Sequence, residues 1–245
     1  MKLRKMSRQS INIYIGAFLL VCGLITINAA ADSSEELNNS ADTPQDLARA
    51  QLLDAITEDY LTLLDFELSK SRDIVQSVLD DDKLLVPHSE IFQKKKMQLK
   101  IYIDLVTEKQ QKKLPPRTQK PARFFYIFSK SLLYKDFIGM IARLEPTDRY
   151  DALIDDTFMD NGLGEFVDAV MEKRNALVAK SVRLIHEYLK GLPAEQQRKA
   201  MAYKLSDWAL KMKQAEEVTE KMANFREFLR YFYLEATITA DKAEL

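Results

Sequence analysis

Residues 193–237 read PAEQQRKAMAYKLSDWALKMKQAEEVTEKMANFREFLRYFYLEAT, and the apolar spacing in this stretch decides the fold. Apolar residues recur at steps of three and four, with one three–three step at Ala215. The stripe consists of Met201, Leu205, Trp208, Met212, Ala215, Val218, Met222, Phe225, Leu229, Phe232 and Ala236. Steps of three and four place side chains on one side of a helix, and near-heptad spacing is typical of coiled-coil packing. The stretch therefore predicts one long last helix.

A helix of matching length is predicted to begin at Thr43-Pro44-Gln45-Asp46, which offers a hydroxyl cap, a proline in the first turn and an early acid. Apolar residues then follow at helical spacing: Leu53, Ile56, Tyr60, Leu63, Leu68, Val75 and Val78. Asp80-Asp81-Asp82 is unfavourable at the negative end of a helix, so the helix should end there. We expect the first and last helices to lie alongside each other. The alternative is a homodimer formed through the last helix.

Four further helices are expected between these two. Pro87-His88-Ser89-Glu90 opens one that runs to about residue 113, and the others cover about 122–144, 146–160 and 163–190. The 122–144 segment is the most apolar, so we expect it to be the central helix. Only six glycines are present, which leaves little material for the turns of a sheet. The predicted fold class is all-α: an antiparallel bundle of about six helices with long first and last helices and coiled-coil-like pairing.

The N-terminus has the pattern of an export signal. A basic start precedes the apolar run 11–27, and Ala29 and Ala31 supply the small residues that a signal peptidase reads. We expect a signal peptide over 1–31, a flexible linker over 32–43 and a helical domain over 44–245. The product would be exported to the periplasm or secreted. Two alternatives are an uncleaved inner-membrane anchor and, less favoured by its apolar surroundings, lipid attachment at Cys22.

Composition argues against several kinds of chemistry. Cys22 is the only cysteine, so cleavage would leave no thiol for a disulfide, a nucleophile or a metal. Without the leader, 32 bases face 37 acids, which gives no global case for nucleic-acid binding. Neither His88 nor His186 has the partners of a helical metal site, and residues 155–168 do not fit a calcium loop. We therefore name no catalytic, cofactor-binding or metal-binding residue.

The charges are unevenly distributed along the chain. Ten bases and two acids lie between Lys94 and Arg123, just before an aromatic run at 124–126, whereas residues 145–172 are acidic. These lysines could solvate a helix or pair with the acidic segment. Alternatively, they could bind an anionic membrane or lipid, or an acidic protein. The candidate patch for an anionic partner comprises Lys94, Lys95, Lys96, Lys100, Lys112, Lys113, Arg117, Lys120 and Arg123.

A second aromatic cluster lies near the C-terminus. It consists of Phe225, Phe228, Tyr231, Phe232 and Tyr233. These residues are spread around a helix, so they either fill a wide core or form an exposed binding patch.

These observations favour an exported, non-enzymatic helical protein of the bacterial cell envelope or secretome. Such a protein would bind another protein, a lipid or an apolar partner through its helical faces. One alternative is an exported hydrolase with two carboxylates converging among the helices over 146–190. The other is a secreted effector or toxin that acts on a host or a competitor.

Overall fold

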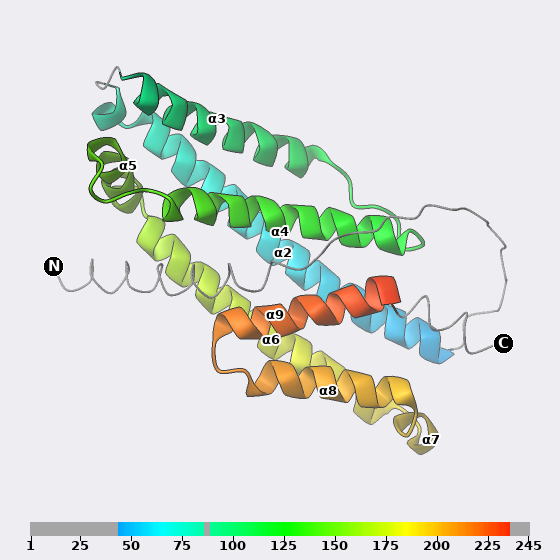
Figure 1. The fold of residues 1–245 in the computed structure, drawn as a ribbon. Helices are drawn as coiled ribbons and strands as arrows, with labels where there is room; N and C mark the ends of the chain where they lie inside the picture. Colours follow the sequence, from blue (N-terminus) through cyan, green and yellow to red (C-terminus); the bar gives the residue numbers. More distant parts are fainter. Residues whose placement is uncertain (1–43, 86–88, 236–245) are drawn as a thin grey trace.

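The computed structural model describes residues 44–85 and 89–235, and within these ranges it is helical, with no strand (Figure 1). Its eight α-helices are α2 (Pro44–Asp80), α3 (Glu90–Gln111), α4 (Lys120–Ala142), α5 (Arg149–Asp160), α6 (Leu163–Gly191), α7 (Ala194–Gln197), α8 (Ala200–Gln214) and α9 (Val218–Arg230). A short 3-10 helix, η1 (Asp82–Leu84), follows α2, and a π-helix, η2 (Tyr231–Glu235), follows α9. The all-helical prediction is confirmed.

Several predictions fall outside the described residues. These are the signal segment, the linker 32–43, His88 and the last residue of the apolar stripe, Ala236. In the part of the chain that the structure describes, no helix combines the length and the apolar character needed to cross a bilayer.

Helix α2 is the axis of the molecule, and its main neighbour is α6 (Figure 1). Its apolar residues enter two separate clusters. Ile56, Tyr60 and Leu64 belong to a first cluster with residues of α6, α8, α9 and η2. Leu68 and Val75 belong to a second cluster with residues of α3, α4, α5 and the start of α6. A single long helix thus connects two cores.

The helix boundaries between α3 and α6 follow local sequence signals. The Ser89 hydroxyl accepts a hydrogen bond from the Phe92 N–H and caps α3, while the Asp148 carboxylate accepts bonds from the first turn of α5. Gly162, with φ of 86°, adopts the left-handed conformation between α5 and α6. These signals explain why the four middle helices match their predicted ranges within a few residues.

The prediction of one long last helix is wrong. The chain forms α7, α8 and α9 instead, and it leaves helical conformation at residues 215–217. The break coincides with the three–three step, which would carry the apolar stripe about 120° around a continuous helix. By breaking there, the chain packs α8 and α9 against each other, and Met212 and Phe225 both become buried in the first cluster.

Two further expectations are corrected. The principal neighbour of α2 is α6 rather than the last helix, although Tyr60 still contacts Phe225 edge to face at 5.1 Å. Helix α4 is not central, because one of its sides is exposed at Phe125, Phe128 and Leu132. The helix is rich in apolar residues because it carries one buried apolar stripe and a second, exposed one on the opposite side, and not because all of its sides are buried.

The C-terminal aromatic cluster is part of the core. Phe225, Phe228, Phe232 and Tyr233 are all buried in the first cluster. The apolar stripe that could have supported a homodimer is therefore largely used within the chain.

Candidate binding surface on helices α3 and α4

The nine predicted patch residues do not gather on one surface. Three lie at the start of α3, where each has a partner: Lys94 pairs with Glu90 at 2.7 Å, Lys95 pairs with the buried Asp151 of α5, and Lys96 donates to the Leu84 carbonyl at 3.1 Å. Since the 22 residues of α3 span about 33 Å, these lysines lie far from those that follow the helix. The pairing of Lys95 with Asp151 confirms that the basic and acidic segments meet within the fold.

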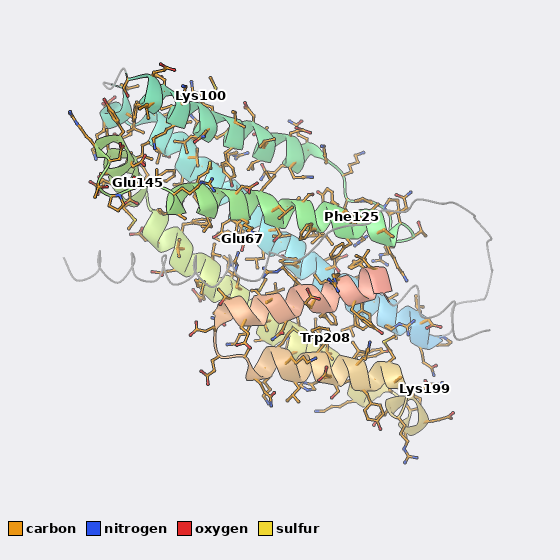
Figure 2. All side chains as sticks on the ribbon, in the orientation of Figure 1. Glu67, Lys100, Phe125, Glu145, Lys199 and Trp208 are labelled. Atoms are coloured by element: carbon orange, nitrogen blue, oxygen red, sulfur yellow. The ribbon has the colours of Figure 1, made fainter. Side chains whose placement is uncertain are left out.

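The remaining bases lie at or beyond the end of α3, except Lys100, which is exposed midway along it (Figure 2). Lys112 pairs with Glu108 at 2.6 Å, and Lys113 and Lys120 are exposed. Arg117 bonds Asp54 at 2.9 Å from an exposed position. Arg123, which the sequence placed in the candidate patch, is buried instead.

Arg123 is buried because α4 turns its side chain toward α2. Its Nη2 atom lies 3.5 Å from Asp54 Oδ1, so Asp54 receives two guanidinium groups. Burial raises the pKa of the adjacent Tyr233 hydroxyl, although its hydrogen bonds with Thr57 and Arg123 limit the rise. The Arg123 Nε–H has no hydrogen-bond partner among the described residues. This side chain ties α4 to α2 and η2.

A second buried polar group separates the two apolar clusters. Glu67 Oε1 accepts a hydrogen bond from Arg174 Nε at 2.8 Å, and the guanidinium lies 5.0 Å from the centre of the Tyr134 ring. Burial raises the pKa of Glu67, while Arg174 opposes that rise. Burial acts to lower the pKa of Arg174, but the charge and hydrogen bond of Glu67, together with the neighbouring Tyr134 and Tyr60, outweigh burial and raise that pKa. The pair joins α2 to α6 and explains why a carboxylate is tolerated inside.

The acidic segment supplies structural contacts. Asp148 caps α5, Asp151 accepts from the Glu145 N–H at 3.0 Å, and Asp160 pairs with Lys83 at 2.7 Å. Within the ranges 44–85 and 89–235, no three His, Cys, Asp or Glu side chains are placed to hold a metal ion. These contacts give the carboxylates roles in capping and ion pairing.

An open groove runs between α2 and α6. Leu63, Phe66 and Leu177 contribute apolar surface to it. Asp59 and Lys180 bridge the two helices at 2.7 Å, and the Lys173 ammonium lies 4.7 Å from the centre of the Phe66 ring. Its lining side chains are therefore already engaged with one another.

The most distinctive surface is an apolar stripe on the outside of α3. Met97, Ile101 and Leu105 follow one another at steps of four, and all three are exposed. The buried side of the helix carries Phe92, Leu99, Tyr102 and Val106. At 3.6 residues per turn, the exposed stripe lies nearly opposite the buried one.

Helix α4 carries an equivalent stripe, formed by Phe125, Phe128 and Leu132. Its opposite side is buried and includes Lys130, which pairs with Asp65 of α2. Helix α3 likewise turns Gln110 toward Ser69 of α2, at 2.8 Å. Both exposed stripes therefore point away from α2.

Helices α3 and α4 contact each other, and their two stripes together make up the exposed apolar surface of this helix pair. We call it the outer apolar face and define it as Met97, Ile101, Leu105, Phe125, Phe128 and Leu132. Among the described residues, eleven large hydrophobic side chains are exposed, and six belong to this face. Such a concentration distinguishes the face from the scattered exposed apolar residues of ordinary protein surfaces.

Three aromatic rings, Phe124, Phe125 and Phe128, lie near the start of α4, where Figure 2 labels Phe125. Phe124 stacks on Phe128 with 6.0 Å between ring centres and meets Phe125 edge-on at 5.8 Å. Phe124 is half-buried and also contacts Tyr233 of η2 at 6.4 Å. The exposed rings of Phe125 and Phe128 thus pack against Phe124, which is held in place by its contact with η2.

Sequence reasoning identified the basic residues and the aromatic run but missed the stripe on α3. A signal was present, because Met97, Ile101 and Leu105 recur at helical spacing beside the separate stripe that contains Leu99 and Tyr102. Two apolar stripes on one helix indicate two packed sides.

Comparison with known proteins gives no relative: no family model, no curated protein and no solved structure matches this chain.

Proposed function

We propose that this chain is an exported, non-enzymatic helical protein of the cell envelope or secretome that acts by binding a partner through the outer apolar face. The single observation behind the proposal is that six large apolar side chains gather on the outside of α3 and α4. An exposed apolar patch of this kind marks an interaction site in a folded protein.

The position of the face strengthens the argument. Phe92, Tyr102 and Phe137 already supply the inner sides of α3 and α4 with apolar contacts in the second cluster. The outer residues are thus not needed to complete that core. Their apolar character is better explained by a partner that covers them.

The export signal and the finer architecture belong to the same proposal. Residues 1–31 would direct the chain out of the cytoplasm, to the periplasm or the medium, or would hold it at the inner membrane if they are retained. The helices would form one antiparallel bundle, with coiled-coil-like pairing between α2 and α6, which make the most extensive helix–helix contact of the described residues.

The proposal can be tested by comparing a triple variant of the outer apolar face with a double variant of α8 in the producing cell. Ile101→Ser, Leu105→Ser and Phe128→Ser together alter the outer apolar face, and Tyr203→Ser with Leu210→Ser alters exposed apolar residues of α8. Cells would be fractionated, the N-terminus of the product sequenced, and sedimentation with the envelope measured.

We expect the outer-face variant to lose envelope association while the α8 variant keeps it. Equal association of both variants, with both folded, would contradict a role for the outer apolar face. A full-length product free in the cytosol would contradict export. Release of the wild type into the medium would favour the effector alternative over an envelope protein.

A further inference from the structure

The charge of the chain changes sharply where the outer apolar face meets the loop between α3 and α4. Residues 109–135 contain eight bases and no acid. Three of the bases, Lys113, Arg117 and Lys120, are exposed around the start of α4. The first turn of α4 has no acidic residue and no side-chain cap, so its partial positive charge adds to theirs.

Few acids reach this region from elsewhere in the described structure. Asp54 of α2 bonds Arg117 at 2.9 Å but also faces Arg123, and Glu108 of α3 pairs with Lys112. Lys113 and Lys120 have no ion-pair partner in the two described ranges. The region therefore carries a net positive charge.

Exposed aromatic rings project from the same place. Phe125 is 49% exposed, and Phe128 is stacked on the half-buried Phe124. We call Phe124, Phe125, Phe128, Lys113, Arg117 and Lys120 the basic–aromatic tip. Rings that enter an interface and cations that remain at its surface are the two components of peripheral membrane binding.

We infer that the basic–aromatic tip docks on the surface of an anionic lipid bilayer. Phe125 and Phe128 enter the headgroup region, and Lys113, Arg117 and Lys120 contact lipid phosphates. This inference rests on the proposed function, since it names the partner of the outer apolar face.

The composition of the tip favours a bilayer over a protein. Protein interfaces are depleted in lysine at their centres, whereas an anionic membrane attracts lysine and arginine at its surface. Lys120 begins α4 five residues before Phe125, and the Tyr126 hydroxyl donates to the Lys112 carbonyl at 3.0 Å, which places the end of the α3 segment beside the same end of α4. An acidic protein partner remains a distinct outcome of the test.

The experiment measures binding of the chain, as recovered from cells that export it, to sedimenting vesicles. One set contains phosphatidylcholine alone and the other adds phosphatidylglycerol. Wild-type protein is expected to bind the anionic set and to be released by high salt. Lys113→Gln with Lys120→Gln should weaken binding about 25-fold, because each cation near the surface contributes a factor of about five.

A matched control removes the same charge elsewhere. Lys190→Gln with Lys199→Gln alters exposed lysines beside α7, on a different part of the molecule (Figure 2). This variant should bind like the wild type. Phe125→Ser with Phe128→Ser should lose more than about tenfold in binding, since both rings leave the apolar phase, whereas Tyr203→Ser with Leu210→Ser should not.

Fluorescence locates the docking face independently. Trp208 of α8 is the only tryptophan and lies away from Phe125 in Figure 2. Brominated lipid should leave Trp208 unquenched in the wild type and should quench a tryptophan introduced as Phe128→Trp in a Trp208→Phe chain. Quenching of Trp208 instead would show docking through another face and would overturn the inference.

Failure of the inference can be separated from failure of the proposed function. Absence of anionic-vesicle binding, equal binding to both vesicle sets, or unchanged binding by the tip variants would each overturn lipid docking. If the outer-face variant still loses envelope association, and protease treatment of the envelope abolishes that association for the wild type, the partner is a protein. The proposed function would then stand without the lipid assignment.

Discussion

The helix pairs α3–α4 and α8–α9 are built alike but differ in how much apolar surface they expose. Both contain amphipathic helices joined by a short break, and both pack beside the α2–α6 axis (Figure 1). In α8–α9 the main apolar stripe is buried, and the large exposed apolar residues are Tyr203 and Leu210. In α3–α4 a buried stripe is accompanied by a second, exposed one. The difference suggests that α8–α9 completes a core and that α3–α4 presents a surface.

The largest expected effect tests whether the buried stripes are equivalent. Phe225 of α9 and Phe137 of α4 are both fully buried. Phe225→Ala and Phe137→Ala should each lower the free energy of unfolding by about 3–5 kcal/mol, because a large cavity replaces each ring. Chemical denaturation followed by circular dichroism would measure this. A small effect at Phe137 would mean that α4 packs loosely and would weaken the comparison.

The next effect concerns the ion pair between the two clusters. Arg174→Met should destabilise the protein by about 3 kcal/mol, because it leaves the buried Glu67 without a cation. Adding Glu67→Leu should recover most of that loss, since the unpaired charge is then gone. Denaturation curves of both variants would show whether one polar contact couples the core of α8–α9 to that of α3–α4. Equal stability of the single and double variants would exclude this coupling.

A smaller effect follows from the pKa of Glu67, which burial raises above the usual glutamate value of 4.5. The folded carboxyl then binds its proton more tightly than the unfolded one, so its contribution to stability is greatest at low pH. This contribution should decline as pH rises above about 4.5, by at most about 1.4 kcal/mol per pH unit. The difference in unfolding free energy between the wild type and Glu67→Gln should therefore fall with pH. If the difference in unfolding free energy instead rose with pH, the effect of Arg174 would outweigh burial and the pKa of Glu67 would be lowered.

The smallest stability effect is expected on the exposed stripe. Leu105→Ser with Phe128→Ser should change the free energy of unfolding by no more than about 0.5 kcal/mol, as for most surface substitutions. The same denaturation series would measure it. A loss comparable to that of Phe137→Ala would show that the outer apolar face supports the fold and not a partner.

Sequence reasoning succeeded where the signal was local. Ser89, Asp148 and Gly162 mark helix ends through their own backbone hydrogen bonds and conformations, so the middle helices were predicted closely. The break at Ala215 was visible as an irregular step in the apolar spacing. Spacing alone, however, cannot distinguish a continuous helix whose apolar stripe moves to another side from two helices joined by a turn. The neighbour of α2 depended on that break and was therefore also mispredicted.

The candidate site was only partly predictable. Charge composition located the bases near the start of α4, but the burial of Arg123 depends on Asp54, which lies far away in sequence. The exposure of Met97 and Ile101 depends on what covers α3, and periodicity identifies a helix side without identifying its partner.

The most direct measurement of the central claim uses cysteine accessibility. The only natural cysteine is Cys22, so Cys22→Ser gives a background for single probes. Leu105 of α3 and Leu210 of α8 are 45% and 49% exposed, which makes Leu105→Cys and Leu210→Cys a matched pair. Maleimide should label both at similar rates in purified protein, and in the intact envelope it should label Leu105→Cys much more slowly while Leu210→Cys is unchanged. Equal labelling of both sites in the envelope, or protection of Leu210→Cys alone, would contradict the claim that α3–α4 presents the binding surface.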